Sequence, residues 1–303
     1  MSEALVAEGQ DMSYCHAALL QRRGVIRVAG ADARKYLQGL ITNDIAKAQD
    51  GRAIHAGLLN PQGKILFDFF VVAANGGYLL DVVKDKSGEL TKRLSFYRLR
   101  AEVDIVDEPS LAISAAWGGE PHPFKGAVVY PDPRLPELGF RVILRAGSTS
   151  AAELGCSPAS EADYDTNRIR LSVPEGGLDY GFGEAFPHEA LFDQLNSVDF
   201  GKGCYVGQEV VSRMEHRGTA RRRIVPIESE AALPAPGSSI EVGNMPIGTI
   251  GSVRGASGLA LVRLDRAEEA LARGIPLTAA GVKLRLRQPS FAKFSVPAAA
   301  LSA

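Results

Sequence analysis

Apolar and polar positions in the first third of the chain predict alternating strands and helices. Apolar runs with the length of β-strands lie at residues 24–29, 53–59, 65–73, 78–83 and 101–106. Amphipathic helices are expected at residues 33–40 and 87–97, and Asp32 is a candidate N-cap of the first helix. The segment Asn60-Pro61-Gln62-Gly63 predicts the turn of a hairpin. In this order the elements resemble a split βαβ unit with one additional strand.

The rest of the chain divides into two further units. After Pro109, strands are expected at residues 111–116 and 140–144, and helices at 150–154 and 161–171. After Gly218, short apolar pieces alternate with Gly and Pro, which predicts a small antiparallel barrel or sandwich. We therefore expect domains at residues 1–108, 109–217 and 218–303. Residues 1–13 are predicted to form a mobile leader and residues 298–303 a frayed tail.

The composition is that of a globular protein. The 303 residues are 46% apolar and 23% charged, and the net charge is −1. This charge provides no overall field that would attract nucleic acid, so a nucleic-acid partner is not expected. The N-terminus lacks the apolar core of a secretory signal, and no apolar stretch is long enough to span a bilayer, so no membrane partner is expected.

The three cysteines, Cys15, Cys156 and Cys204, are far apart in the sequence. No CxxC pair exists, so neither a zinc site nor a permanent iron–sulfur cluster is expected. An odd number of scattered cysteines indicates a reducing compartment. The five histidines show no metal-ligand spacing. We predict a cytoplasmic protein without a resident metal.

The segment KGCYVGQE at residues 202–209 has the most distinctive chemistry. Cys204 follows Lys202 and precedes a helix that begins near Gly207, and both the cation and the helix dipole favour a thiolate. Glycines at 201, 203 and 207 allow close approach of the backbone to a ligand. The alternative is an inert, buried cysteine. On the helix, Val210 and Met214 are expected to face inward.

KGCYVGQE resembles the signature of the YgfZ family, whose members bind tetrahydrofolate and assist the maturation of iron–sulfur proteins. The family is similar to the T-protein, the aminomethyltransferase of the glycine cleavage system. Three further segments support the resemblance: YLQGLITNDI at 36–45, LLNPQGKILFD at 58–68 and FYRLRAEVDI at 96–105. It implies an α+β fold with two intertwined ferredoxin-like α/β units around a central channel and a C-terminal antiparallel β-barrel.

The resemblance also implies a reduced folate as ligand, held in a pocket that contains the thiol of Cys204. A folate site requires amides or carboxylates for the pterin, apolar or aromatic walls, and a cation for the glutamate tail. The residues expected to bind folate are Asn43, Asp44, Tyr97, Arg98, Glu184, Gly203, Tyr205, Gly207, Gln208, Glu209 and Arg213.

Several of these residues have simpler alternative roles. Asn43 and Asp44 could cap a turn, and Glu209 and Arg213 could form a solvated surface pair. Lys202 is an alternative cation for the tail. T-proteins carry two adjacent acids where this chain has Phe67 and Asp68, so ordinary aminomethyl transfer is in doubt.

Three functions follow from the sequence. The first is a folate-binding accessory factor in iron–sulfur cluster assembly or repair, with Cys204, Lys202 and Asp68 as chemical groups and with assembly or client proteins as partners. The second is a T-protein-like one-carbon transferase, and the third is a non-catalytic scaffold. The run from Arg221 to Arg223 is interpreted as a solvated edge-strand face rather than a tRNA contact.

Overall fold

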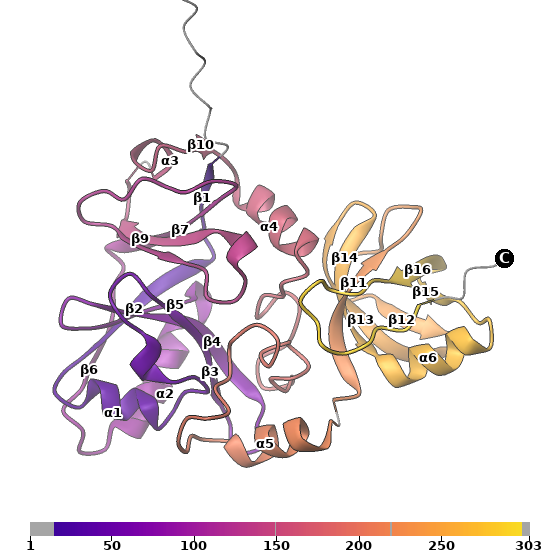
Figure 1. The fold of residues 1–303 in the computed structure, drawn as a ribbon, viewed down its shortest axis with the longest axis horizontal. Helices are drawn as coiled ribbons and strands as arrows, with labels where there is room; N and C mark the ends of the chain where they lie inside the picture. The colour runs from indigo at the N-terminus through magenta and orange to yellow at the C-terminus, as the bar shows by residue number, and fades with distance from the viewer. Residues whose placement is uncertain (1–14, 149, 219, 299–303) are drawn as a thin grey trace, which may run out of the picture.

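The computed structural model describes residues 15–148, 150–218 and 220–298 (Figure 1). The predicted mobile leader at residues 1–13 therefore lies outside the described residues, as does most of the predicted C-terminal tail. Among the described residues, no helix combines the length and the apolar character that crossing a membrane requires.

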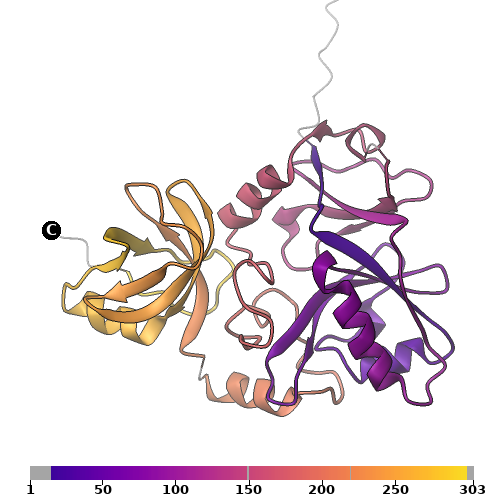
Figure 2. The ribbon, with the colours of Figure 1, turned by 180° about the vertical axis from the view of Figure 1, so that it is seen from behind.

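The first unit is an antiparallel sheet covered by two helices. Its strands, in spatial order, are β3 (Ile54–Leu59), β4 (Ile65–Ala74), β5 (Gly77–Val83), β2 (Arg23–Ala29) and β6 (Asp104–Asp107). Helices α1 (Ala33–Gln38) and α2 (Ser87–Arg98) cover one face, where Leu37 and Leu94 pack with Ile26, Leu58 and Phe69 (Figure 2). The predicted order of elements in this unit is observed.

The second sheet packs on the opposite face of the first. Its strands, in spatial order, are β10 (Ser157–Pro158), β1 (His16–Leu19), β7 (Leu111–Trp117), β9 (Phe140–Arg145) and β8 (Val128–Pro131). Phe70 and Leu79 of the first sheet share a core with Ala18, Ile113 and Tyr130 of the second. Because β1 leads directly into β2, the chain enters through one sheet and continues in the other, which intertwines the two units.

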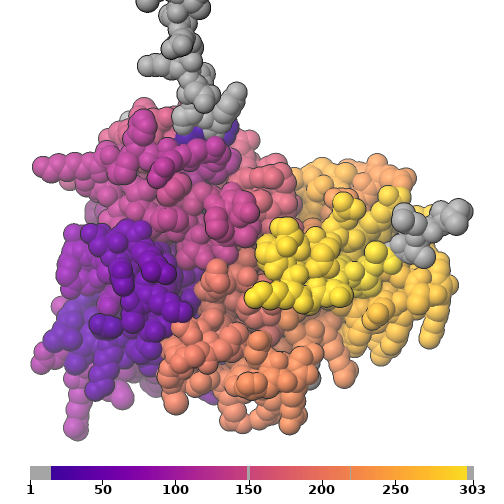
Figure 3. Space-filling model, viewed as in Figure 1, coloured from indigo at the N-terminus to yellow at the C-terminus, as the bar shows by residue number. Residues whose placement is uncertain are grey.

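The C-terminal unit is a closed barrel with a helix beside it. Its strands close in the order β11 (Arg222–Glu228), β14 (Ser257–Arg263), β13 (Met245–Arg254), β12 (Ser239–Val242), β15 (Leu277–Ala279) and β16 (Val282–Leu286). Helix α6 (Leu264–Ala272) was not predicted; it buries Ala267 and Ala270 in the barrel core. After β16 the chain returns to the second unit on the side that faces the viewer in Figure 3, and there Lys293 N donates to Gln194 Oε1 (2.8 Å).

The remaining helices connect these units. They are α3 (Ser150–Glu153), α4 (Glu161–Arg170), α5 (Gln208–Arg217) and the 3₁₀ turns η1 (Ile45–Lys47), η2 (Lys84–Lys86) and η3 (Pro136–Leu138). Ser160 and Asp163 form a reciprocal capping box at the start of α4. Asp32 precedes α1 but does not cap it, because its carboxylate accepts a hydrogen bond from Glu102 N (2.9 Å).

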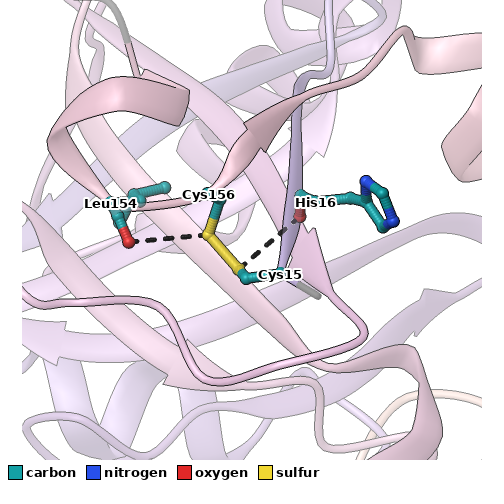
Figure 4. Close-up of a disulfide and its surroundings, with 4 residues drawn as sticks. All are labelled: Cys15, His16, Leu154 and Cys156. Atoms are coloured by element: carbon teal, nitrogen blue, oxygen red, sulfur yellow. Dashed lines mark hydrogen bonds between the residues drawn. A yellow bond between two sulfur atoms is a disulfide. The ribbon is translucent and has the colours of Figure 1, made fainter. Parts of the chain in front are cut away.

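The structure joins Cys15 and Cys156 in a disulfide (Figure 4). The bond links the start of β1 to the start of β10, and both cysteines are buried. The scattered cysteines indicated a reducing compartment and did not predict this pairing, because the two cysteines are 141 residues apart in the sequence. The cysteines meet because β1 crosses into the second sheet, which the strand pattern did not indicate.

Candidate functional site

Two anchors, the half-buried Asp199 and the buried Lys202, hold the loop that carries Cys204. Asp199 Oδ1 accepts hydrogen bonds from Gly201 N (2.7 Å) and Lys202 N (3.1 Å). The ammonium of Lys202 donates to the carbonyl oxygens of Gln38 (2.7 Å), the last residue of α1, and of Ile41 (2.5 Å), just after the helix. Burial lowers the pKa of Lys202 to about 8, against the attraction of Asp44 and Asp199. Lys202 is therefore primarily a clamp on the loop.

Cys204 is a free, exposed thiol at the tip of this loop. Gly203 before it is exposed, whereas Tyr205 after it is buried beneath the Lys202 ammonium, which lies 5.0 Å from the ring centroid. Burial raises the pKa of Tyr205 to about 12. The prediction that Cys204 lies inside a pocket is corrected: the anchors on both sides turn inward and leave the thiol at the surface.

Gly207 fixes the junction between the loop and α5. It has φ +81°, and a Cβ at this position would lie 2.6 Å from Asn60 O of the β3–β4 turn. The glycine is therefore required by backbone geometry. Gln208, the first residue of α5, is half-buried, and its N–H donates to Tyr205 O (3.3 Å).

The outer face of α5 is a solvated surface. Glu209 and Arg213 pair at 2.7 Å with both side chains exposed, which agrees with the alternative of a surface ion pair. Val211, rather than Val210 or Met214, is the buried residue of this helix. The predicted inner face is therefore incomplete: Val210 and Met214 are half-buried, and Val210 lies beside Gly63 of the β3–β4 turn, but the fully buried residue is Val211.

Asp68 lies in a sealed position. It is buried in β4, accepts a hydrogen bond from the hydroxyl of Tyr180, and has a pKa raised by burial. Phe67 is also buried, with its ring 6.3 Å from that of Phe182. A Cβ on Gly176 would come within 2.6 Å of Asp68 Oδ2, which shows how tightly the chain closes over this carboxyl.

Asn43 and Asp44 organise the backbone. The amide nitrogen of Asn43 donates to the carbonyls of His55 (2.9 Å) and Asn196 (2.7 Å), and its oxygen accepts from Asp44 N (2.9 Å). Asp44 accepts from Ala46 N (3.0 Å) and so caps η1. These contacts support the capping role for both residues.

A cavity of about 640 Å³ lies beside the Cys204 loop, between the two sheets. Its lining residues are Asn43, Lys47, Gly51, Arg52, Ala53, Ile54, Pro131, Pro133, Asn196 and Val198. Lys47 extends toward the loop and pairs with Asp199 Oδ2 at 2.7 Å. Arg52 has no carboxylate partner among the described residues. The cavity has the size of a small-molecule site, apolar walls and two cations.

Of the predicted folate contacts, Asn43 alone is among the residues that line this cavity, and Tyr97, Arg98 and Glu184 lie elsewhere in the described structure. Tyr97, at the end of α2, packs on the core of the first sheet. Arg98 is exposed, with Nη1 3.4 Å from Val103 O. Glu184 is exposed and folds over Gly181, where a Cβ would lie 2.6 Å from Oε2. The predicted contacts therefore do not converge on one site, because the elements that carry them end on different faces.

The sequence reading missed a buried charge network between the sheets. Asp81 in β5 binds both Arg23 (2.6 Å) and Arg141 (2.7 Å), and Arg134 pairs with Asp132 (2.8 Å). The sequence signal for this network was the presence of oppositely charged residues in strands that are otherwise apolar. A charge in such a strand is expected to be buried, and a buried charge requires a partner of opposite sign.

The structure also brings together His188, Asp193 and Glu215, whose ligand atoms all lie within 4.8 Å of one another. Their sequence spacing did not indicate this. Arg223 Nη1 lies 2.7 Å from Asp193 Oδ1, so a cation already neutralises that carboxylate. In this structure the three residues and Arg223 form an ion-pair network rather than a metal site.

The arginine run is partly buried. Arg222 pairs with Glu189 (2.7 Å), and Arg223 is buried against Asp193. The interpretation of residues 221–223 as a solvated edge-strand face is wrong for Arg223, which is buried, whereas Arg221 and Arg222 are exposed. Arg222 and Arg223 pair with β14, and β16 pairs with Ile227 and Glu228 at the other end of β11.

Comparison with solved structures confirms the predicted fold. An aminomethyltransferase T of the glycine cleavage system from Bartonella henselae superimposes with a TM-score of 0.74 and 16% identity over 93% of this chain and 87% of that chain. At this identity the likeness concerns the fold alone. Residues 221–294 match the family model described as CAF17, C-terminal beta-barrel domain.

Comparison with curated proteins finds iron-sulfur cluster assembly factors named IBA57. The Mus musculus protein is 30% identical over 81% of this chain and 77% of its own length, and the Homo sapiens protein 31% identical over 80% and 76%. The Neurospora crassa homolog is 33% identical over 68% of this chain. The chain spans 52–59% of the length of three fungal relatives of this name.

These relatives are mitochondrial proteins. The prediction of a cytoplasmic protein is therefore wrong. It was based on an odd number of scattered cysteines and the absence of a secretory signal, and neither feature distinguishes between reducing compartments.

Proposed function

Because the chain belongs to the IBA57 family of iron–sulfur cluster assembly factors, we propose that it assists iron–sulfur cluster assembly through the thiol of Cys204. The cluster is cargo, carried by partner proteins. The supporting observation is that Cys204 is free and exposed on an anchored loop. The resemblance of KGCYVGQE to the YgfZ signature also supports this proposal. The proposed outcome is the maturation of [4Fe–4S] proteins.

The exposure of Cys204 bears on what its thiol can reach. A thiolate is the form of cysteine that binds iron, and an exposed thiolate can reach a cluster held at the surface of another protein. The anchors at Asp199 and Lys202 keep the loop in one arrangement, so little conformational freedom is lost when a partner binds. Contact with a partner's cargo therefore suits Cys204 better than chemistry within a closed pocket.

Reduced folate is proposed as an accessory ligand in the cavity lined by Asn43 and Arg52. The volume of about 640 Å³ suits a pterin with its aromatic linker, the walls include Ile54 and Val198, and Lys47 and Arg52 suit the carboxylates of the tail. Asn43 already uses its amide for backbone contacts, so recognition of the pterin would fall mainly to backbone groups and water.

One-carbon transfer is less well supported. A catalytic carboxylate must reach its substrate, but Asp68 is buried and engaged by Tyr180. The transferase alternative would require the segment around Gly176 to open.

Complementation tests the role of the thiol. In cells that lack the gene, Cys204→Ser should fail to restore the activity of a [4Fe–4S] enzyme, whereas an enzyme without a cluster should be unaffected. Ser212→Ala, a small change on the helix that follows the loop, is the matched control and should restore activity. Full restoration by Cys204→Ser at equal protein level would refute the thiol role.

A further inference from the structure

Resting on the proposed function, we propose that an anionic ligand in the cavity is coupled to the Cys204 loop through Lys47 and Asp199. Ligand binding would change the reactivity of the thiol without touching it. The two residues connect the cavity wall to the loop, and a ligand carboxylate would compete with Asp199 for Lys47.

The two carboxylate oxygens of Asp199 contact different partners. Its Oδ2 pairs with Lys47 Nζ at 2.7 Å, and its Oδ1 accepts from Gly201 N and Lys202 N. Its own N–H donates to Thr42 O (3.0 Å), which fixes the backbone. The hydrogen bonds from Lys47 and the two amides hold the pKa of Asp199 below its usual value against the effect of burial. The side chain is therefore an ionised link between the half-exposed ammonium of Lys47 and the loop.

The cavity side of this link is suited to an anion. Lys47 is half-exposed, so its ammonium can turn from Asp199 toward a ligand without a change in the backbone. Arg52 lines the same cavity with no carboxylate partner among the described residues. The ligand class is a flat, largely apolar body with a carboxylate tail, of which a reduced folate is one member.

The loop side determines the direction of the effect. When Lys47 pairs with a ligand, the Asp199 carboxylate keeps only the amides of Gly201 and Lys202 as partners. Its negative charge is then shared between fewer donors, and these two hydrogen bonds strengthen. The loop is held more tightly, and Cys204 samples fewer of the arrangements in which its thiol can be attacked.

Alkylation of the whole, oxidised protein tests the coupling. Cys15 and Cys156 form the disulfide, so Cys204 is the free cysteine of the described chain. The probe is 5-formyltetrahydrofolate, with its affinity measured by calorimetry. At saturation the alkylation rate should fall about two- to fivefold, the range of a surface ion pair.

Two variants separate this mechanism from others. Asp199→Asn should abolish the effect of the ligand on the rate, and should bind the probe at least as tightly because Lys47 loses its competitor. Asp50→Asn removes the same charge near Gly51 without a contact to the loop, and should behave like the wild type. A ligand that shields the thiol directly would still slow alkylation in Asp199→Asn.

The outcomes are distinct. Binding with no change in rate, or an unchanged effect in Asp199→Asn, overturns the coupling and leaves folate binding intact. No binding by calorimetry overturns both the folate ligand and the coupling. Neither result affects the role of the thiol in cluster assembly, which complementation tests separately.

Discussion

The hydroxyl of Tyr180 donates a hydrogen bond to the buried carboxyl of Asp68, and this pair seals the strand face where a transferase would need an open acid. Tyr180 belongs to the segment that follows α4, whereas Asp68 lies in the middle of β4. The contact therefore joins the two α/β units. It gives Asp68 a structural role in this chain.

Asp68 should make stability depend on pH. Burial raises the pKa of Asp68, so the folded state holds a proton that the unfolded state has released. Its contribution is fully present below the ordinary aspartate pKa and is lost as pH rises through the folded pKa. We expect the stability of Asp68→Asn relative to wild type to increase as the pH rises above the ordinary aspartate pKa of about 4.

Urea denaturation at several pH values measures this dependence. Asp50→Asn, an exposed aspartate, is the control and should follow the wild-type curve. A constant difference between Asp68→Asn and wild type across the pH range would contradict the assignment.

Lys202→Met should weaken the anchor of the Cys204 loop. The carbonyls of Gln38 and Ile41 would each lose a donor, which should cost about 1–3 kcal/mol of unfolding free energy. Cys204 should also be alkylated faster. The pKa of Lys202 is lowered to about 8 from 10.5, so wild-type stability should rise with pH across this interval, and that rise should be missing in the variant.

Gly207→Ala should destabilise the protein more than Gly218→Ala. Both glycines have positive φ, so each alanine should cost about 1–2 kcal/mol. At Gly207 the new methyl also meets Asn60 O at 2.6 Å, whereas nothing lies within 4 Å at Gly218. The clash should add about 1–3 kcal/mol. Equal losses in chemical denaturation would show that Gly207 tolerates a side chain.

Removal of the disulfide should lower stability without removing the functional thiol. The double variant Cys15→Ser, Cys156→Ser should lose about 2–4 kcal/mol, because the bond constrains a long loop of the unfolded chain. Reductant should lower the denaturation midpoint of wild type but not of this variant. Cys204→Ser should keep the response to reductant; its absence there would mean that the buried cysteines are not bonded.

The sequence by itself determined the local elements and the position of the special segment. Period-two and amphipathic patterns located β2, β4 and α2 to within a few residues, because these signals depend on neighbours along the chain. Cys204 and Gly207 were identified from their residue types and their resemblance to a known signature. Strand β6 was displaced, and α6 was missed although its nine residues bury Ala267 and Ala270 on one face.

Only the tertiary structure decided which partners each of these side chains contacts. The Cys15–Cys156 bond, the Asp68–Tyr180 contact and the Lys47–Asp199 link all join residues more than a hundred positions apart. Such pairs form because β1 crosses between sheets and the 174–207 segment returns over the first unit, and no local pattern encodes those crossings. The fold thus turned Lys202 inward as a clamp and left the thiol of Cys204 at the surface.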